Sequence, residues 1–386
     1  MQFNDFKLER YFAKYEFNVE YLLSSSDCES MSIPELLEYA DKDGKEMWFN
    51  LKLGYTESKG HPALREAIAG LYQKISPEDL LVITPEEGVF IALNALLQPG
   101  DGVISIYPAY QSLLEIPRAM GCKITTWPLE AKDDGNWTLD LNKLENSINN
   151  KTNARTRLLI INFPHNPSGF LPSPDLFEDI ISLARRNNIY ILSDEMYWMS
   201  EHNLAERLPA VADVYEKGVS LFGVSKTFGL PGLRIGWLAT GDRTLMAKCA
   251  SFKDYTTICC SAPSEVLAFI GLRAKEQLIA RNLRIIKKNL SLAEEFFGKY
   301  PATFQWFAPK AGSTAFPALT ADIPVEVFCE DVVMKKNLMI LPGTVFDYGQ
   351  DLGPVATCAR NHFRVGLGRN NFHLALARLG EYLAHR

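Results

Sequence analysis

The chain has 386 residues, of which 47% are hydrophobic and 22% are charged. That composition allows a large buried core and excludes a wholly disordered chain. The 40 Lys and Arg against 46 Asp and Glu leave a formal net charge of -6, which argues against a general nucleic-acid-binding surface. No uncharged apolar stretch reaches the roughly 18 residues of a membrane span. We expect a soluble protein of two or three domains, at roughly 150 residues per domain, that binds neither nucleic acid nor membrane.

The cysteines and the N-terminus indicate a cytoplasmic protein. Seven cysteines at irregular spacings match no metal-ligand pattern and no disulfide framework. Reduced thiols are the simplest interpretation, and we expect no metal site. Residues 1–20 carry charges that a secretory signal peptide lacks, at Asp5, Lys7, Glu9, Arg10 and Lys14.

Short apolar runs typical of buried strands alternate with helical patterns through the middle of the chain. This alternation predicts an α/β fold, with a mostly parallel sheet and helices on both faces. The predicted helices are Val89–Leu97 and Leu176–Asn187. The predicted strands are Leu81–Thr84, Val103–Ile106, Leu158–Asn162, Ile189–Leu192, Val219–Phe222 and Ile235–Thr240.

The C-terminal part of the chain follows a different pattern. One long helix is predicted from Ser264 to Tyr300, followed by short strands at Leu338–Leu341 and Phe363–Leu367 and a last helix at Phe372–Tyr382. We expect a smaller α+β unit here, packed with the first fifty residues, which show no sheet of their own. The predicted division is a large domain over residues 50–280 and a small domain built from residues 1–49 and 281–386.

A lysine follows a predicted strand in a glycine-rich loop. The run from Ser225 to Trp237 reads SKTFGLPGLRIGW. A lone lysine in such a loop is most often exposed, but Phe228 and Leu230 predict a partly buried loop, and burial lowers the pKa of a lysine. Such a lysine can form a Schiff base with an aldehyde. Arg234 adds a fork of donors suited to a phosphate.

This run resembles the S-K-x-F-G-x-x-G-x-R-x-G-W motif of the class I/II aminotransferases, fold-type I enzymes that depend on pyridoxal 5′-phosphate (PLP). The resemblance implies a Schiff base on Lys226 and phosphate contacts from Arg234 and Ser225. Gly223 departs from the pattern, because many relatives carry a phosphate-binding serine there. The implied fold is a mostly parallel sheet sandwiched by helices, with a smaller α+β domain.

Two more motifs follow predicted strands, at the end where parallel sheets bind ligands. SDEMY, which begins at Ser193, resembles the family's D-E-x-Y: Asp194 would face the pyridinium nitrogen and Tyr197 the phenolic oxygen O3′. NFPHNPSG resembles N-x-P-x-N-P-x-G, where Asn166 would contact O3′ and the substrate, whereas His165 has no catalytic role. Taken alone, these motifs could equally be a solvated strand end and a rigid loop.

Residues 84–88, TPEEG, join a predicted strand to a predicted helix, and a helix N-terminus attracts anions. The position is similar to the family's phosphate cup, T-x-G-A-x-E. The resemblance implies that the backbone amides of Glu87 and Gly88 bind the phosphate. Glu86 and Glu87 stand where Gly and Ala are common, so both carboxylates would have to point away.

Two tyrosines match aromatic positions of the family. Tyr110, in YPAY, would stack on the PLP ring, although an aromatic residue at such a place is more often part of the core. Tyr55, in LGYT, resembles the tyrosine that reaches the phosphate of the neighbouring subunit. That likeness implies a homodimer with shared active sites.

Substrate contacts are predicted near both ends of the chain. Arg364, in HFRVG, resembles the arginine that binds the substrate α-carboxylate, although a strand arginine is usually a surface ion pair. Asp27 and Glu29 lie in a segment that contributes to the substrate side of the pocket in the family. They are either a solvated turn, or at least one contacts a basic side chain of the substrate. In the second case, arginine would react more readily than aspartate.

These motifs together predict a PLP-dependent aminotransferase, which moves the amino group of an L-amino acid to a 2-oxo acid through a Schiff base and a carbanion. Lys226 would be the general base. LLSSSDCES, PEEG and YPAYQSL resemble a branch with capreomycidine synthase and the PLP-dependent arginine oxidases and hydroxylases. An oxidase, hydroxylase or cyclase of an arginine-like amino acid is therefore the alternative. A PLP-fold sensor domain of a transcription regulator is a third hypothesis, but the residues before Tyr55 are mixed in charge, unlike a basic DNA-binding module.

Overall fold

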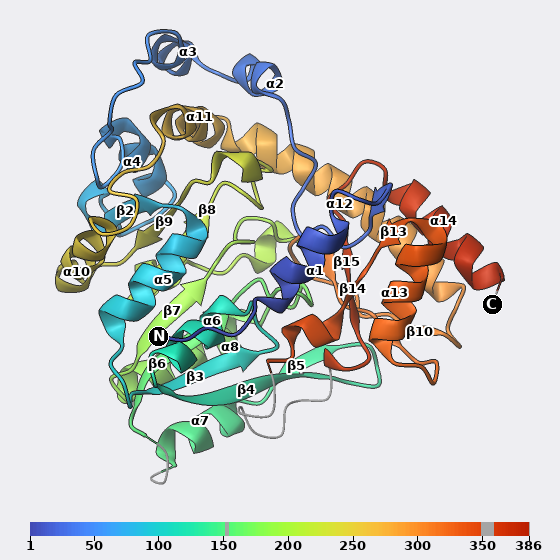
Figure 1. Ribbon diagram of the computed structural model, residues 1–386. Coiled ribbons are helices and arrows are strands. Elements are labelled where there is room, and N and C mark those ends of the chain that lie inside the picture. The colour runs from blue at the N-terminus through green and yellow to red at the C-terminus, as the bar shows by residue number, and fades with distance from the viewer. Residues whose placement is uncertain (151–153, 349–358, 386) are drawn as a thin grey trace.

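An eight-stranded sheet forms the centre of the molecule in the computed structural model, which describes residues 1–150, 154–348 and 359–385 (Figure 1). Five neighbouring strands run parallel, and the strands at both ends of the sheet are antiparallel to their neighbours. The expected α/β fold with a mostly parallel sheet is thus confirmed. The order across the sheet is β2 (Leu80–Ile83), β9 (Gly236–Ala239), β8 (Gly218–Gly223), β7 (Tyr190–Asp194), β6 (Thr156–Asn162), β3 (Gly102–Tyr107), β4 (Lys123–Ala131) and β5 (Trp137–Leu139).

Helices cover both faces of this sheet because the central strands carry apolar side chains on both sides. In β6, Leu158 and Ile160 belong to one hydrophobic cluster, and Leu159 and Ile161 belong to another. This alternation follows from the two-residue period of a strand. The first cluster includes buried residues of the helices on one face of the sheet, α5 (Pro85–Leu96), α6 (Ser112–Ala119) and α10 (Arg243–Lys253). The second includes buried residues of the helices on the other face, α7 (Leu141–Asn149), α8 (Pro174–Arg186) and α9 (Val211–Val214).

The long helix expected from Ser264 to Tyr300 is two helices, α11 (Ala262–Arg273) and α12 (Lys275–Gly298). The break lies at Ala274, whose φ of -97° and ψ of 19° leave helical geometry. The two helices meet different surroundings. α11 is buried from Glu265 to Leu272 and packs against α4 (Pro62–Ala69), whereas α12 buries one face only. A single straight helix would not satisfy both burial patterns.

Segments from the N-terminal and C-terminal parts of the chain meet beside α12, although the two termini themselves lie apart (Figure 1). β1 (Tyr21–Leu22) pairs in parallel with β13 (Leu338–Met339), and α1 (Lys7–Tyr15) packs near Gly343–Phe346. The helices α2 (Ile33–Glu38) and α3 (Lys42–Phe49) pack instead against α11. The remaining elements of the C-terminal unit are β10 (Phe304–Gln305), β11 (Thr314–Ala315), β12 (Ala318–Leu319), α13 (Val325–Lys336), β14 (Leu341–Pro342), β15 (Phe363–Gly366) and α14 (Phe372–Ala384).

The division of the chain at residues 50 and 280 stays a prediction. The pairing of β1 with β13 supports a unit built from both chain ends, and the packing of α2 and α3 on α11 links residues 33–49 to the large sheet. No helix in the described ranges combines the length and the apolar character that crossing a bilayer requires.

Candidate active site

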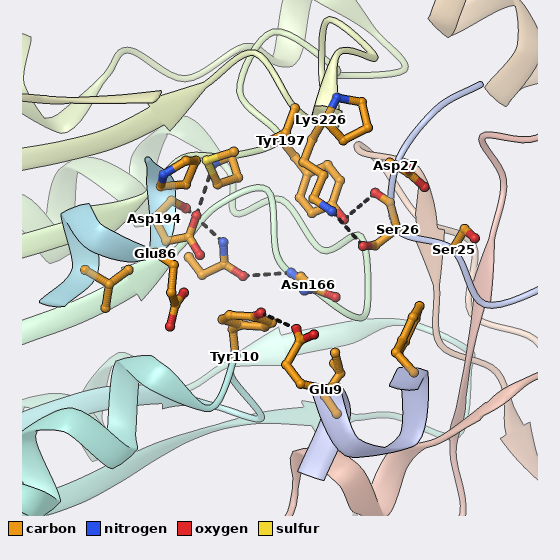
Figure 2. Close-up of a pocket in the computed structure, with 18 of the residues that line it drawn as sticks. Glu9, Ser25, Ser26, Asp27, Glu86, Tyr110, Asn166, Asp194, Tyr197 and Lys226 are labelled. Carbon is orange, nitrogen blue, oxygen red and sulfur yellow. Dashed lines mark hydrogen bonds between the residues drawn. The ribbon is translucent and has the colours of Figure 1, made fainter. Parts of the chain in front are cut away.

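A pocket of about 400 Å³ lies where β6 and β7 end and where the loop after β8 begins. Parallel strands bring their carboxyl ends to one edge of the sheet, so side chains that follow different strands converge there. The start of α5, the helix α1, the segment after β1 and the strand β15 complete the wall. Figure 2 shows Asp194 and Glu86 on one side of this space and Lys226, Ser26 and Asp27 on the other.

Lys226 follows β8 and is buried in the pocket wall. Its Nζ donates a hydrogen bond to Oγ of Ser26, at 2.8 Å. Burial lowers the pKa of Lys226, Asp27 opposes this effect, and the positive charge of Arg364 adds to it. A lysine with a lowered pKa has a larger neutral fraction, which is the form that attacks an aldehyde.

Asp194 is the last residue of β7, and its carboxylate is buried in the pocket. The backbone N–H of Met196 donates to it at 3.1 Å, and no cation of the described residues forms an ion pair with it. Burial raises the pKa of Asp194 to about 6, against the opposing effects of the Met196 N–H and of Lys226. A buried carboxyl in this state would be stabilised by a cationic ligand group.

Arg364 reaches the pocket from β15 and is only 1% exposed. Its Nε donates to the carbonyl oxygen of Ser24 at 3.1 Å, and its Nη1 donates to Oδ1 of Asn166 at 3.3 Å. Asn166 is held in turn by its own N–H, which donates to Oδ1 of Asn162 at 2.8 Å. The structure therefore brings Asn166 and Arg364, which are 198 residues apart in the chain, to one place.

Two predicted aromatic residues also line the pocket. The hydroxyl of Tyr197 donates to the carbonyl oxygen of Ser26 at 2.8 Å, and burial raises the pKa of Tyr197 to about 12. The hydroxyl of Tyr110 donates to Oε1 of Glu9 at 2.8 Å (Figure 2). The ring of Tyr110 packs against that of Phe6, with 5.1 Å between the centroids.

The residues predicted to bind the phosphate divide into two groups. Ser225 and Arg234 line the pocket. The carboxylate of Glu87 points elsewhere, accepting hydrogen bonds from the hydroxyls of Thr256 and Thr257. Gly88 is buried, and a Cβ there would lie 2.1 Å from Cδ1 of Ile83, so no side chain fits. The phosphate contacts of the Glu87 and Gly88 amides stay a prediction.

The two acidic residues at the start of α5 have different surroundings. Glu87 points away from the pocket, as the phosphate cup requires, but Glu86 lines the pocket. The condition that both carboxylates point away is therefore met by Glu87 and not by Glu86. Its position at the start of the helix places it beside Ser112 of α6, whose hydroxyl donates to it at 3.2 Å.

The remaining predicted residues lie at the edge of the pocket or outside it. Asp27 lines the pocket and accepts hydrogen bonds from Nη2 of Arg369 at 2.9 and 3.0 Å. Glu29 lies outside the lining, 4.0 Å from Arg369, and accepts the N–H of Asn370. Tyr55 is 95% exposed and lies outside the pocket, so its contact with a neighbouring subunit stays a prediction.

The sequence reasoning missed two acidic residues on the N-terminal helix and its end. Glu9 and Glu16 line the pocket together with Phe12 and Leu8. Glu9, Phe12 and Glu16 follow a helical spacing, which shows that they share a face. The sequence pattern does not show that this face lies over residues that follow strands of a distant sheet.

Comparisons with known proteins identify the family of the chain. The family described as aminotransferase class I and II matches residues 22–371. Capreomycidine synthase of Streptomyces vinaceus is 28% identical over 312 residues, which cover 80% of this chain and 78% of that protein. A PLP-dependent aminotransferase from Streptococcus suis has a TM-score of 0.89 at 27% identity, covering 100% of this chain and 99% of its own. The PLP-dependent cyclase OrfR has a TM-score of 0.85 at 26% identity, covering 100% and 98%.

The chemistry of the pocket fits PLP. The buried amine of Lys226 suits the aldehyde of PLP. The buried carboxyl of Asp194 suits the ring nitrogen, because it forms no ion pair with a cation among the described residues. Tyr110 supplies an aromatic face for the ring, and Ser225 and Arg234 supply hydrogen-bond donors for the phosphate. The expected fold type I is confirmed by the similar structures. The chain therefore belongs to the class I and II aminotransferase family, and its cofactor is pyridoxal 5′-phosphate.

Proposed function

We propose that this protein is a PLP-dependent aminotransferase that acts on an L-amino acid with a cationic side chain and passes its amino group to a 2-oxo acid. One observation carries the proposal. The pocket has a buried arginine, Arg364, and on the side of α1 it has the three acidic residues Glu9, Glu16 and Asp27. An arginine fork suits an α-carboxylate, and acidic residues in the pocket wall favour a positive side chain.

The roles of the reacting groups follow from their surroundings. When bound, PLP supplies an electron sink for the pair of electrons released at the α-carbon. Nζ of Lys226 takes the α-proton, a role that requires its neutral form and is favoured by the lowered pKa. Asp194 holds a proton on the ring nitrogen, and Arg364 fixes the α-carboxylate.

Glu16 is the best candidate for the contact with the substrate side chain. Asp27 is already paired with Arg369, whereas no ion pair or hydrogen bond holds the Glu16 carboxylate within the described ranges. Burial raises the pKa of Glu16, the negative charges of Asp27 and Glu9 raise it further, and the positive charges of Arg369 and Lys226 only partly oppose this rise. A guanidinium or ammonium group would relieve this repulsion, and a second carboxylate would increase it.

A panel of amino acids tests the proposal. The holoenzyme is mixed with arginine, lysine, aspartate or glutamate, the change in cofactor absorbance is followed, and the 2-oxo acid product is identified. We expect the basic amino acids to react faster. Glu16→Gln should narrow the preference for basic over acidic amino acids about tenfold, because it removes a charge interaction of roughly 1.4 kcal/mol.

Glu29→Gln is the matched control, because Glu29 lies outside the pocket and should leave the preference unchanged. Faster reaction of the wild type with aspartate than with arginine would refute the basic substrate.

A cyclase or oxidase acting on the same kind of amino acid is the second candidate. It is favoured by the likeness to capreomycidine synthase and to the cyclase OrfR. Product analysis with and without a 2-oxo acid, combined with an oxygen electrode, separates the two. Transamination requires the 2-oxo acid and consumes no oxygen, whereas oxidation consumes oxygen and cyclisation yields a ring without any acceptor.

We also propose a cytoplasmic homodimer. Phe49 and Leu53, which precede Tyr55 in the chain, are likewise exposed, and Tyr255 and Ile258 expose further apolar surface. A second copy of the chain would cover such side chains. Light scattering should give twice the mass of the chain, and Tyr55→Ala should weaken PLP binding if Tyr55 reaches the partner's phosphate. A monomer that retains full activity would contradict this assembly.

The free cysteines among the described residues support a reducing compartment.

A further inference from the structure

Glu86 is an acidic side chain in the wall of a pocket whose cofactor carries an anionic phosphate. It belongs to the first turn of α5 and lines the same pocket as Ser225 and Arg234, the two side chains suited to hold that phosphate. Figure 2 shows it beside Asp194 and Tyr110. None of the roles assigned to the pocket so far uses this carboxyl.

The charged and polar groups around Glu86 come from several elements. Ser112 of α6 donates a hydrogen bond to Oε2 at 3.2 Å. Glu9 of α1 and Asp194 of β7 are negative neighbours, and Arg234 is a positive one. The negative charge of Glu86 in turn helps to raise the pKa of the Tyr110 phenol. No cation in the part of the chain that the structure describes forms an ion pair with Glu86.

These surroundings disfavour the ionised form. Burial raises the pKa of Glu86 to about 7; the Ser112 hydroxyl opposes this effect, Glu9 and Asp194 add to it, and Arg234 opposes it. Its neighbour Glu87 differs, because hydrogen bonds from Thr256 and Thr257 hold its pKa below the usual range against the effect of burial. Of these two adjacent acids, Glu86 lines the pocket, and its surroundings stabilise the ionised carboxylate less than those of Glu87 do.

We propose that Glu86 makes cofactor binding sensitive to pH: its protonated carboxyl accommodates the phosphate anion in the pocket, and its ionised carboxylate repels it. The sign follows from the charges. As pH rises through the titration of Glu86, the pocket gains a negative charge and its affinity for the phosphate falls. By linkage, binding of the phosphate above this range takes up a proton.

The test uses the full-length chain freed of PLP and titrated with pyridoxine 5′-phosphate. This ligand has no aldehyde, so it forms no Schiff base with Lys226, and no amino acid is present. The result is therefore independent of the proposed reaction and substrate. If Glu86 stays protonated in the complex, a pKa of about 7 limits the loss of affinity between pH 6.5 and 8.5 to about 25-fold.

We expect Kd in the wild type to rise about tenfold more over this range than in Glu86→Gln. Calorimetry in buffers of different ionisation enthalpy should also show, at pH 8.0, up to about 0.9 proton more taken up by the wild type. Other titrating groups, Asp194 and the phosphate itself included, are common to both proteins and cancel in the comparison. Equal slopes and equal proton uptake would overturn the proposal.

Two further variants complete the test. Ser112→Ala removes the hydrogen bond that supports the ionised form, so the fall in affinity should shift to higher pH. This variant decides the matter if Glu86→Gln does not fold, because an unshifted profile would contradict the proposal. Asp213→Asn is the matched control. Asp213 is another buried carboxyl, but it lies outside this pocket, so the wild-type pH dependence should remain.

Discussion

Replacement of Asp194 by asparagine removes a charge from the pocket and keeps the shape of the side chain. Burial raises the pKa of Asp194 from 3.8 to about 6, which corresponds to about 3 kcal/mol for holding it ionised without a partner. A cationic ring nitrogen offsets this cost when the cofactor binds. The same interaction is lost in Asp194→Asn, where the ring nitrogen would lose its proton near neutral pH and accept electrons poorly.

A loss of about 3 kcal/mol corresponds to roughly a hundredfold fall in kcat, because each 1.36 kcal/mol is a factor of ten. The assay is turnover at pH 7 with a saturating amino acid, combined with the rate of α-proton exchange into solvent. Asp213→Asn serves as the control, since Asp213 is a carboxyl outside the pocket that accepts the N–H groups of Gln73 and Lys74. A change in kcat below about threefold for Asp194→Asn would refute the reasoning.

Three further predictions concern the cofactor lysine, a buried histidine and a glycine. Lys226→Ala should abolish turnover and leave PLP bound non-covalently, as dialysis and absorbance would show; near-normal turnover would exclude the role given to Lys226. His165 is buried, and burial lowers its pKa to about 4. Its contribution of about 3 kcal/mol to the unfolding free energy should therefore be lost as pH falls from about 6.5 to 4. Denaturant titrations should show that the unfolding free energy of His165→Asn depends less on pH in this range. Gly88→Ala should lower stability by about 1–3 kcal/mol, because its Cβ would lie 2.1 Å from Ile83; an unchanged Tm would contradict the packing described.

The sequence predicted the central strands because parallel strands are buried on both faces. β6, β7 and β8 appear as short apolar runs, and the motifs that follow them contain Asn166, Asp194 and Lys226. Neighbouring parallel strands end at one edge, so these residues meet in one pocket. The strand β4, which lies next to the edge strand β5, was not predicted, since it is partly exposed and carries the polar residues of a strand with a solvent face.

The rest of the site depends on contacts between distant segments. Glu9 and Glu16 are ordinary charges of an N-terminal helix until α1 is placed over the pocket. Glu86 and Glu87 are identical in type and adjacent in the chain, and only the position of α6 and of Thr256 gives them opposite orientations. The interruption of the long helix at Ala274 likewise follows from the surroundings of α11 and α12, because the residue itself favours helix.

The central claim is that Lys226 carries the cofactor. Reduction of the holoenzyme with borohydride fixes PLP to the lysine that holds it, and peptide mapping by mass spectrometry then identifies that residue. We predict a phosphopyridoxyl group on Lys226. Lys253 is the informative comparison, because it is only 1% exposed but bonds to Thr257 outside the pocket. Modification of Lys253, or of any other lysine with Lys226 left free, would contradict the account.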